Sequence, residues 1–289
     1  MIVVFGSLNI DMVMRVAEMP RSGNTVVCPG YASVPGGKGA NQAAAAALSG
    51  GRVEMYGCLG KDEFGKQLRT SLSSTGVDTR HILTQEDYPT GCAMICVDLQ
   101  GENMIVVASG ANTQVKADHV IDEVLTKDTT LLMQCEVPQE ETCALILRAK
   151  AIGARTILNL APARKIPTEI LEALDYLIMN EIEVTVLALH LGFDAVSPTI
   201  AARRITATYG TTCIVTLGGE GSFVSTPTQE WEVPALRVAT VDTTAAGDAF
   251  CGALAAQLDQ GKSLQDALKF AAVASSLTCT RAGAQTSLP

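Results

Sequence analysis

Short runs of apolar, β-branched residues alternate along this chain with longer stretches that have helical periodicity. Ile2–Phe5 and Thr212–Leu217 are typical of strands, whereas Gly39–Leu48 is mostly alanine, is closed by a pair of glycines and predicts a tightly packed helix. We expect further strands at Val53–Leu59, Leu131–Cys135, Thr156–Leu160 and Tyr176–Met179, and further helices at Phe64–Ser74, Pro138–Ala151, Gly247–Leu258 and Leu264–Thr278. This alternation predicts an α/β fold, in which helices cover both faces of a mostly parallel central sheet.

Two segments, residues 10–34 and 91–108, do not fit the alternation. The first consists of extended pieces joined by a turn at 20–23, and the second has the pattern of a β-hairpin that turns at Gly101. Both leave the parallel core near its start, so we expect one small antiparallel sheet that projects from the core; ordinary surface hairpins are the alternative. The 289 residues contain no internal repeat and no low-complexity linker, and we expect a single domain, 1–289.

The charge balance and the cysteine pattern narrow the classes of function. With 21 Lys and Arg against 30 Asp and Glu, the formal net charge is −9, so nucleic acid and anionic membranes would be repelled as generic partners. The 9 cysteines form no Cys-x-x-Cys pair and the 3 histidines are far apart, which favours reduced thiols over disulfides and disfavours a zinc site or a His-centred triad. No apolar stretch reaches the ~20 residues that span a bilayer, and the start lacks the features of a signal peptide. We expect a cytoplasmic protein.

Polar or glycine-rich clusters directly after strands are the first candidates for a site, because ligands in open α/β sheets bind at the carboxyl ends of the strands. Asn9 and Asp11 follow the first strand. Their amide and carboxylate groups can hydrogen-bond the vicinal hydroxyls of a sugar. The alternative is a turn in which both side chains bond their own backbone.

A second cluster, residues 35–42, reads Pro-Gly-Gly-Lys-Gly-Ala-Asn-Gln. Glycines before a helix let a ligand approach exposed backbone N–H groups. The cluster lacks the spacing of a Walker A loop, and the chain has no Gly-x-Gly-x-x-Gly motif. A flexible glycine turn is the alternative interpretation.

Two further clusters combine carboxylates with the start of a helix. Asn180 and Glu183 are one helical turn apart, where they can hold a hydrated magnesium ion and orient phosphates; an N-cap followed by first-turn acids is the alternative. The small residues 245–247 leave backbone N–H groups uncovered at a helix start, which is a site where charge on a transferring phosphoryl group can be neutralised. Asp248 in the same turn can accept a proton from an attacking hydroxyl. A capped helix would explain Asp248 but not the small residues before it.

With these clusters in this order, the chain resembles the ribokinase family of PfkB-type carbohydrate kinases. Both family signatures are present, residues 35–42 and the segment from Asp242 to Asp248, and the similarity runs over essentially the whole chain. The resemblance implies a ribokinase-like three-layer α/β/α sandwich with a small β-sheet lid, which suits the segments at about 10–34 and 91–108. Leu160 stands where ribokinases usually have proline, and Ala272 where many have a histidine that contacts the base.

The resemblance also implies roles for individual residues. It implies Asp248 as the catalytic base and the backbone of Ala245, Ala246 and Gly247 as an anion hole. The implied sugar-binding residues are Asn9, Asp11, Gly37, Lys38, Gly39, Ala40, Asn41, Glu136 and Asp248, with Ala93, Ile95 and Ile105 as apolar lid contacts. The implied ATP-binding residues are Asn180, Thr216, Leu217, Gly218, Gly219, Glu220, Gly221, Gly247, Asp248 and Ala272. The implied metal ligands are Glu183 for magnesium, through water, and Asp242, Thr244, Thr278, Arg281, Gly283 and Ser287 for an activating potassium ion.

We therefore expect an enzyme that uses ATP with Mg²⁺ to phosphorylate the primary hydroxyl of a free sugar, converting D-ribose to D-ribose 5-phosphate. Ribose is favoured over fructose 6-phosphate because Lys38 is the only basic residue near the clusters at Asn9 and Lys38. The alternatives are a kinase of 2-deoxyribose, fructose or a nucleoside, and a non-catalytic sugar- or nucleotide-binding regulator on the same fold. The exposed edges expected of a lid sheet further predict a homodimer in which the lids pair edge to edge.

Overall fold

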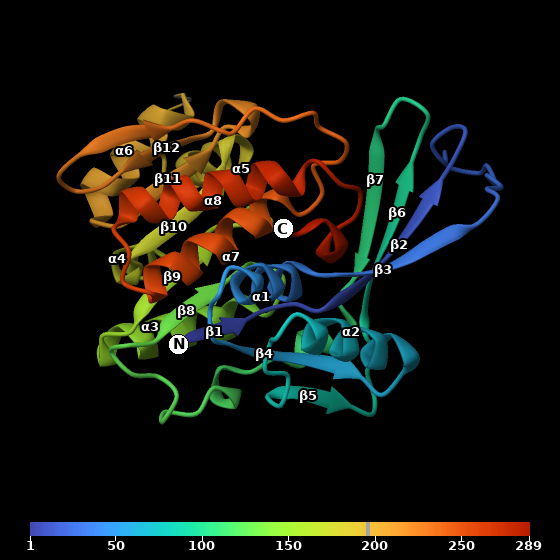
Figure 1. The fold of residues 1–289 in the computed structure, drawn as a ribbon, viewed down its shortest axis with the longest axis horizontal. Helices are drawn as coiled ribbons and strands as arrows, with labels where there is room; N and C mark the ends of the chain where they lie inside the picture. The colour runs from blue at the N-terminus through green and yellow to red at the C-terminus, as the bar shows by residue number, and fades with distance from the viewer. Residues whose placement is uncertain (195–196) are drawn as a thin grey trace.

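The computed structural model describes residues 1–194 and 197–289, and over these residues a nine-stranded sheet runs through the molecule in the order β13-β12-β11-β10-β9-β8-β1-β4-β5 (Figure 1). Its strands are β1 (Ile2–Phe5), β4 (Val53–Gly60), β5 (Ile82–Gln85), β8 (Thr130–Met133), β9 (Arg155–Asn159), β10 (Tyr176–Asn180), β11 (Thr212–Thr216), β12 (Ser222–Ser225) and β13 (Glu230–Val233). Neighbours from β5 to β11 are parallel, whereas β12 and β13 add to one edge in antiparallel pairing. The prediction of an α/β fold with a mostly parallel sheet is confirmed.

Helices cover both faces of this sheet because successive residues of a buried strand point to opposite sides. Ile2 and Val4 pack with α1, α2, α7 and α8 on one face, and Val3 and Phe5 pack with α3, α4, α5 and α6 on the other. The helices are α1 (Lys38–Leu48), α2 (Glu63–Ser74), α3 (Gln139–Ile152), α4 (Thr168–Ala173), α5 (Glu181–His190), α6 (Pro198–Tyr209), α7 (Ala246–Asp259) and α8 (Leu264–Thr278). The three layers are those that the family resemblance implied.

A smaller sheet projects from this body and forms a lid (Figure 1). In the described part of the chain its order is β3-β2-β6-β7, with β2 (Asn9–Arg15), β3 (Tyr31–Gly36), β6 (Gly91–Val97) and β7 (Asn103–Ala108). Segments 10–34 and 91–108 do form one sheet, and the second is the expected hairpin. The prediction that this sheet is wholly antiparallel is wrong, because β2 and β6 leave the body at the same place and run outward in parallel, with Asn9 opposite Gly91.

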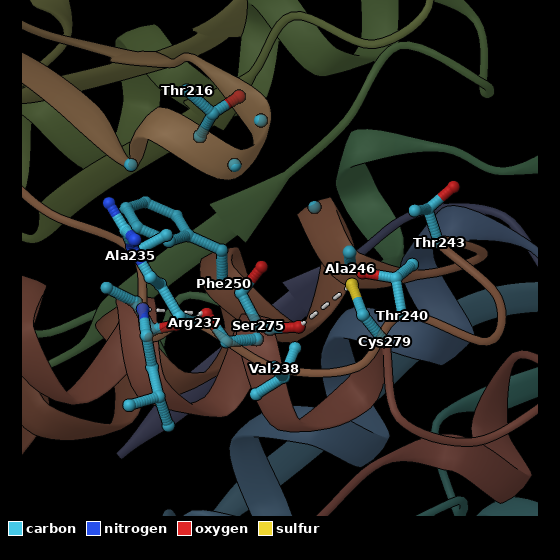
Figure 2. Close-up of a pocket in the computed structure, with 17 residues that line it drawn as sticks. Thr216, Ala235, Arg237, Val238, Thr240, Thr243, Ala246, Phe250, Ser275 and Cys279 are labelled. Atoms are coloured by element: carbon cyan, nitrogen blue, oxygen red, sulfur yellow. Dashed lines mark hydrogen bonds between the residues drawn. The ribbon is translucent and has the colours of Figure 1, made fainter.

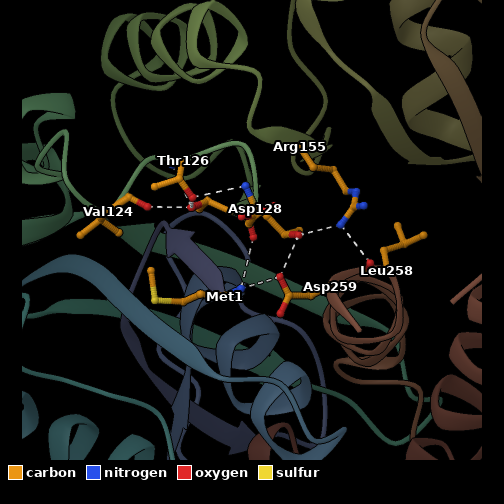
Figure 3. Close-up of polar contacts among 9 residues, drawn as sticks. Met1, Val124, Thr126, Asp128, Arg155, Leu258 and Asp259 are labelled. Atoms are coloured by element: carbon orange, nitrogen blue, oxygen red, sulfur yellow. Dashed lines mark hydrogen bonds and ion pairs between the residues drawn. The ribbon is translucent and has the colours of Figure 1, made fainter. Parts of the chain in front are cut away.

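Polar contacts hold the amino ends of the central strands against the end of α7 (Figure 3). The Met1 amine donates to Asp259 Oδ1 over 2.8 Å, and Arg155 donates to the Leu258 carbonyl oxygen over 2.9 Å. Thr130 joins both residues, because its hydroxyl donates to Asp259 Oδ1 (3.2 Å) and accepts from Arg155 Nη1 (3.0 Å). One end of α7 is thereby fixed to the sheet, and its other end carries Asp248.

The cysteines agree with the expectation of reduced thiols. All nine are free in the structure, and Cys58, Cys135, Cys213 and Cys251 are buried. Across residues 1–194 and 197–289, none of the helices combines the length and the apolar character that crossing a membrane requires.

Candidate active site

The four sequence clusters meet at the carboxyl ends of the parallel strands, beside the lid (Figure 1). Cavities of about 680, 250 and 480 Å³ lie there, which we name the lid cavity, the central cavity and the outer cavity. The lid cavity is lined by Asn9, Asp11, Asn41, Glu136 and Ile105 among others, the central cavity by Asn159, Asn180, Glu183 and Cys251 among others, and the outer cavity by Gly219, Phe250, Ala272 and Cys279 among others.

Shared lining residues join the three cavities into one path. Lys38, Ala245 and Asp248 line both the lid cavity and the central cavity. Ala246 and Gly247 line both the central cavity and the outer cavity. The start of α7 therefore stands where a ligand under the lid would meet a ligand that arrives from the outer cavity.

Asp248 is held at this junction by amides from α1. Asn41 Nδ2 donates to Asp248 Oδ2 over 3.0 Å, and Gln42 Nε2 donates to Asp248 Oδ1 over 2.9 Å. Burial raises the pKa of Asp248 above its ordinary value, whereas the Lys38 ammonium and the two amide donors oppose that rise. A buried carboxylate with two amide donors and a neighbouring cation is suited to accept a proton from a bound hydroxyl.

The first turn of α7 presents backbone N–H groups toward the central and outer cavities. Ala245 has φ 58°, a left-handed conformation that costs an L residue about 1 kcal/mol, and the Ala246 N–H donates to the Thr243 carbonyl oxygen over 3.2 Å. Within the described residues, the amides of Gly247 and Asp248 have no hydrogen-bond acceptor. Such amides at a helix N-terminus attract anions.

Glu136 connects the glycine-rich segment 35–42 to the loop that follows β1. Its Oε2 accepts from the Ser7 hydroxyl over 2.6 Å and from the Lys38 backbone N–H over 3.1 Å. Burial lowers the pKa of the Lys38 ammonium, but the carboxylates of Asp248, Glu136 and Glu183 outweigh burial and raise it. Lys38 is therefore a permanent cation between these carboxylates.

Asp11 faces the same cavity and has an unusual charge state. Burial, followed by the charges of Glu136 and Asp248, raises the pKa of Asp11 to about 7, although Lys38 opposes the shift. Gly36 makes room for this carboxyl, since a Cβ at Gly36 would stand 2.5 Å from Asp11 Cγ.

Asn112 orients Asn9, which begins the same strand, β2. The Leu8 N–H donates to Asn112 Oδ1 (2.9 Å), so Asn112 Nδ2 must be the atom that faces the Leu8 carbonyl oxygen (3.1 Å) and Asn9 Oδ1 (2.7 Å). Asn9 Oδ1 is thereby engaged, and the Asn9 NH₂ group is left to donate into the lid cavity. Gly91 is required beside this pair, because a Cβ there would overlap both amide side chains.

The lid supplies apolar contacts and one further cation. Ala93, Ile95 and Ile105, which were predicted to contact a ligand, all line the lid cavity. Arg15 also lines it, so the interpretation that Lys38 is the only basic residue near this site is wrong. Alternate residues of a strand share a face, and Arg15 therefore lies on the same face of β2 as Asp11.

The outer cavity lies beside α8 and the segment 216–221, as Figure 2 shows for Thr216, Phe250, Ser275 and Cys279. The predicted nucleotide residues that line it are Thr216, Gly218, Gly219, Gly221, Gly247 and Ala272. Gly221 has φ 104°, and a Cβ there would stand 2.7 Å from the Ala235 nitrogen.

Some predicted residues lie behind the cavity walls. Gly39 packs against the first loop, where a Cβ would stand 2.6 Å from the Ser7 nitrogen, and Ala40 is fully buried in the core. Leu160 is buried in the core on the opposite face of the sheet. Leu217 and Glu220 belong to the 216–221 segment but are not part of the described cavity lining, and Asn180 lines the central cavity instead of the outer one.

Comparison with known proteins shows the class of this site. A family model described as pfkB family carbohydrate kinase matches residues 1–289. The chain belongs to that family. A ribokinase of Haemophilus influenzae is 36% identical to this chain over 292 residues, which cover 99% of this chain and 94% of that protein. A deoxyribokinase of Salmonella typhimurium is 33% identical and covers 100% of this chain and 95% of its own. The structure of Arabidopsis thaliana ribokinase complexed with ribose and ATP has a TM-score of 0.90 at 30% identity, and covers 100% of this chain and 95% of its own.

As a pfkB carbohydrate kinase the protein is a phosphotransferase, and Glu183 fits the magnesium ion that this chemistry implies. Glu183 Oε2 accepts from the Asn180 N–H (2.7 Å) and Asn180 Oδ1 accepts from the Glu183 N–H (2.8 Å). The alternative prediction of a capped helix is therefore confirmed. The Glu183 carboxylate lines the central cavity with Asp248. Among residues 1–194 and 197–289, no three His, Cys, Asp or Glu side chains are grouped to hold a metal ion. Magnesium at Glu183 would thus take most of its ligands from water and phosphates.

Asp242 joins two loops of the kinase that hold predicted potassium ligands. Its Oδ1 accepts from the Thr244 N–H (2.9 Å) and hydroxyl (2.6 Å), and its Oδ2 accepts from the Gly283 N–H (3.0 Å). Burial raises the pKa of Asp242, but these hydrogen bonds outweigh burial and hold the pKa below its usual range. The negative charge of an ionised carboxylate in these loops would favour an alkali cation nearby. The other predicted ligands are Thr278 at the end of α8, Arg281 just after it, and Ser287 in the 3-10 turn Gln285–Ser287.

Sequence reasoning missed several residues of the kinase site. Asn112 and Arg15 stand in no motif, and Gln42 ends a motif without a predicted role. Gln134 and Asn159 were not predicted either. The bonds between Gln134 and Gln42, Leu8 and Asn112, and Gln42 and Asn159 join residues 92 to 117 apart in the chain, so no local pattern can reveal them.

Proposed function

We propose that this pfkB kinase is an ATP-dependent ribokinase, which transfers the γ-phosphoryl group of ATP to the primary hydroxyl of D-ribose. The observation that supports this proposal most directly is the place of Asp248, at the junction of the lid and central cavities and beside the free amides of α7. The family membership and the ribokinase relatives support the choice of reaction.

In the proposed complex, ribose lies in the lid cavity and ATP lies in the outer cavity. Asn9 donates to one sugar hydroxyl and Asp11 accepts from another, while Ile95 and Ile105 cover the apolar side of the ring. The adenine side of ATP lies against Ala272, and the triphosphate passes Gly247 into the central cavity. This arrangement brings the primary hydroxyl and the terminal phosphorus together at Asp248, and such positioning supplies much of the rate of phosphoryl transfer.

In the proposed chemical step, Asp248 Oδ2 takes the proton of the primary hydroxyl as the hydroxyl oxygen attacks the γ-phosphorus. The new O–P bond forms, the bond from the γ-phosphorus to the bridging oxygen of ADP breaks, and ADP leaves on the opposite side. The amides of Gly247 and Asp248 bind the equatorial oxygens, where negative charge gathers in the transition state. Lys38 balances the carboxylates that surround the sugar.

Metal ions complete the proposed site. Magnesium bound with ATP would neutralise phosphate charge, and Glu183 would orient its water ligands in the central cavity. Potassium at the loops joined by Asp242 would stabilise the segment 242–245, which precedes α7. Both ions are parts of the proposal and are tested by omission.

A 2-deoxyribokinase is the second candidate, and the deoxyribokinase relative with 33% identity favours it. The two functions differ in one hydroxyl of the sugar. The same motifs are compatible with a fructokinase, a nucleoside kinase or a binding protein without activity, and the substrate panel below distinguishes these from a ribokinase.

We also propose a homodimer formed by the lids. β7 is an edge strand whose residues are all exposed, and Met104 and Val106 present apolar surface there. Exposed apolar edges associate readily. We therefore propose that two lids pair edge to edge through β7.

An ADP-release assay tests the function. The purified protein with Mg-ATP is supplied with ribose, 2-deoxyribose, fructose or adenosine, with and without K⁺, and a second series omits Mg²⁺. Ribose is expected to give the highest kcat/KM, K⁺ to raise it and omission of Mg²⁺ to abolish it. A clear preference for deoxyribose would replace the first candidate by the second, and no ADP with any acceptor would favour a binding protein.

A further inference from the structure

Three buried amide side chains form a hydrogen-bonded chain behind Asp248. Gln42 of α1 and Gln134, just after β8, are fully buried, and Asn159 at the end of β9 is 8% exposed. They come from different elements, and Gln42 connects the other two to the carboxylate of Asp248. None of them has a role in the proposed transfer step.

The polarity of this chain is set by its ends. Asn159 Nδ2 donates to the Ile178 carbonyl oxygen over 3.2 Å, so Asn159 Oδ1 must be the acceptor that faces Gln42. Gln42 Nε2 therefore points toward Asn159, to which it donates over 3.0 Å, and its second hydrogen reaches Asp248 Oδ1 over 2.9 Å. Gln42 Oε1 accepts from Gln134 Nε2 over 2.8 Å. A flipped Gln42 amide would place its oxygen against Asp248 Oδ1, where a carboxylate oxygen has no hydrogen to donate.

The two oxygens of Asp248 consequently have different surroundings. Oδ1 is bonded to Gln42, which lies in the protein interior. Oδ2 is bonded to Asn41, which lines the lid cavity together with Asp248. The amide chain therefore anchors the rear oxygen and turns the front oxygen toward the acceptor hydroxyl.

Close packing of two helices makes this contact possible. Gly252 of α7 lies against α1, where a Cβ would stand 2.6 Å from Ala45 Cβ and 2.7 Å from the Ala46 nitrogen. Asp248 is one turn before Gly252 on the same helix, and Gln42 is one turn before Ala46 on the other. The absence of a side chain at residue 252 thus brings the Gln42 amide within hydrogen-bond distance of the carboxylate.

We propose that Gln42 is a positioning residue for the catalytic base, because its amide, locked by Gln134 and Asn159, holds Asp248 Oδ1 and aims Oδ2 at the acceptor hydroxyl. The proposal rests on the proposed function only in taking Asp248 as the base. Donors that bond a carboxylate favour its charged form. Loss of Gln42 should therefore both misplace the base and make it harder to ionise.

Other ionisable groups near Asp248 also influence its pKa, and the variants of this test do not change them. They are Lys38 from α1, Glu136 after β8, Asp11 from β2, Glu183 from α5 and Cys251 from α7. Because the Gln42 variants leave all five unchanged, a shift between parent and variant reports the change at residue 42.

The test compares Gln42→Met and Gln42→Glu with the parent. We measure kcat and both KM values between about pH 5 and pH 9, since the acid limb of kcat reports the base in the ternary complex. Gln42→Met should lower kcat at neutral pH by about tenfold, leave the KM for ribose and for ATP within about twofold, and move the acid limb up by about one pH unit. Gln42→Glu retains the shape of the side chain, and its carboxyl should move the limb further in the same direction.

If Gln42 had only a structural role, its loss would lower stability without moving the acid limb of kcat. Thr130→Val serves as the matched control, because it removes two partly buried hydrogen bonds at the far end of the sheet. It should lower the melting temperature while the pH profile of kcat stays unchanged. An acid limb in both Gln42 variants that coincides with the parent's would overturn the proposal.

A second measurement separates this proposal from the proposed function. The ¹³C NMR titration of aspartate carboxyls, with Asp248 assigned by its loss in Asp248→Asn, follows the carboxylate without turnover. The Asp248 midpoint should rise in Gln42→Met even if no sugar on the panel is phosphorylated. An unchanged midpoint would contradict the role of Gln42 whatever the substrate.

Discussion

Gly252 of α7 and Ala45 of α1 are in such close contact that a β-carbon on Gly252 would stand 2.6 Å from the β-carbon of Ala45. This contact sets the separation of the helix that carries Asp248 from the helix that carries Asn41 and Gln42. A packing feature in the core therefore determines the geometry at the mouth of the site.

The first prediction follows from that contact. Gly252→Ala should lower the free energy of unfolding by about 1–3 kcal/mol, because the core cannot accept the added carbon without moving a helix. It should also lower kcat, because Asn41 and Gln42 move away from Asp248. Chemical denaturation and steady-state kinetics measure both effects. Gly30→Ala is the control, since a β-carbon there meets open space; equal stability of the two variants would contradict the argument.

A second prediction concerns the charge of Asp11. Its pKa in the folded protein is about 7, against an ordinary value of 3.8. Between these values the folded protein holds a proton that the unfolded chain has lost, so ionisation of Asp11 opposes folding as the pH rises. Asp11→Asn should therefore raise the melting temperature more at about pH 8 than at about pH 4, while the KM for the sugar rises because an acceptor is lost. A stability gain that does not depend on pH would show that the pKa of Asp11 is not raised by folding.

A third prediction concerns Asn112 and the orientation of Asn9. Asn112→Asp keeps the acceptor for the Leu8 N–H but removes the donor to Asn9 Oδ1, so Asn9 should flip and offer its oxygen to the sugar. The KM for the sugar should rise by about tenfold, and the KM for ATP should stay unchanged. A parallel rise in both constants would indicate general damage to the fold.

The proposed lid dimer gives a fourth prediction. The parent should be a dimer by light scattering at micromolar concentration, and Val106→Lys should convert it to a monomer, because a cation on β7 opposes pairing of two lids. Ile121→Lys, a change of an exposed apolar residue on the body, should leave the dimer intact. A monomeric parent would reject the proposal.

Much of the fold was predictable because the spacing of apolar residues along the chain distinguishes strands from helices. Helix Leu264–Thr278 was predicted with the bounds observed, since Ser263 caps it and a glycine precedes the cap. The four-residue strands β12 and β13 and the six-residue helix α4 were not predicted, because such short elements leave only weak periodicity. Helix α6 was not predicted either.

The motifs of the site were predictable from the sequence, but the residues that position the motif side chains were not. Asp248, Lys38 and Asn180 stand in local patterns that a reader of the sequence can recognise. The parallel pairing of β2 with β6, the place of Arg15 and the amides behind Asp248 depend on tertiary contacts between residues that are far apart in the chain. Hydrogen bonds of this kind appear only when the elements are packed.

The most direct test of the account is the turnover of Asp248→Asn. The variant keeps the shape of the side chain but cannot take a proton, so kcat should fall by about 10²–10⁴-fold while the KM for ribose and for ATP stays near the parent value. Asp259→Asn, at the other end of α7, is the matched control: it loses the negative charge that pairs with the Met1 amine and should cost stability without a loss of kcat. A kcat of Asp248→Asn within about twofold of the parent would contradict the assignment of the base.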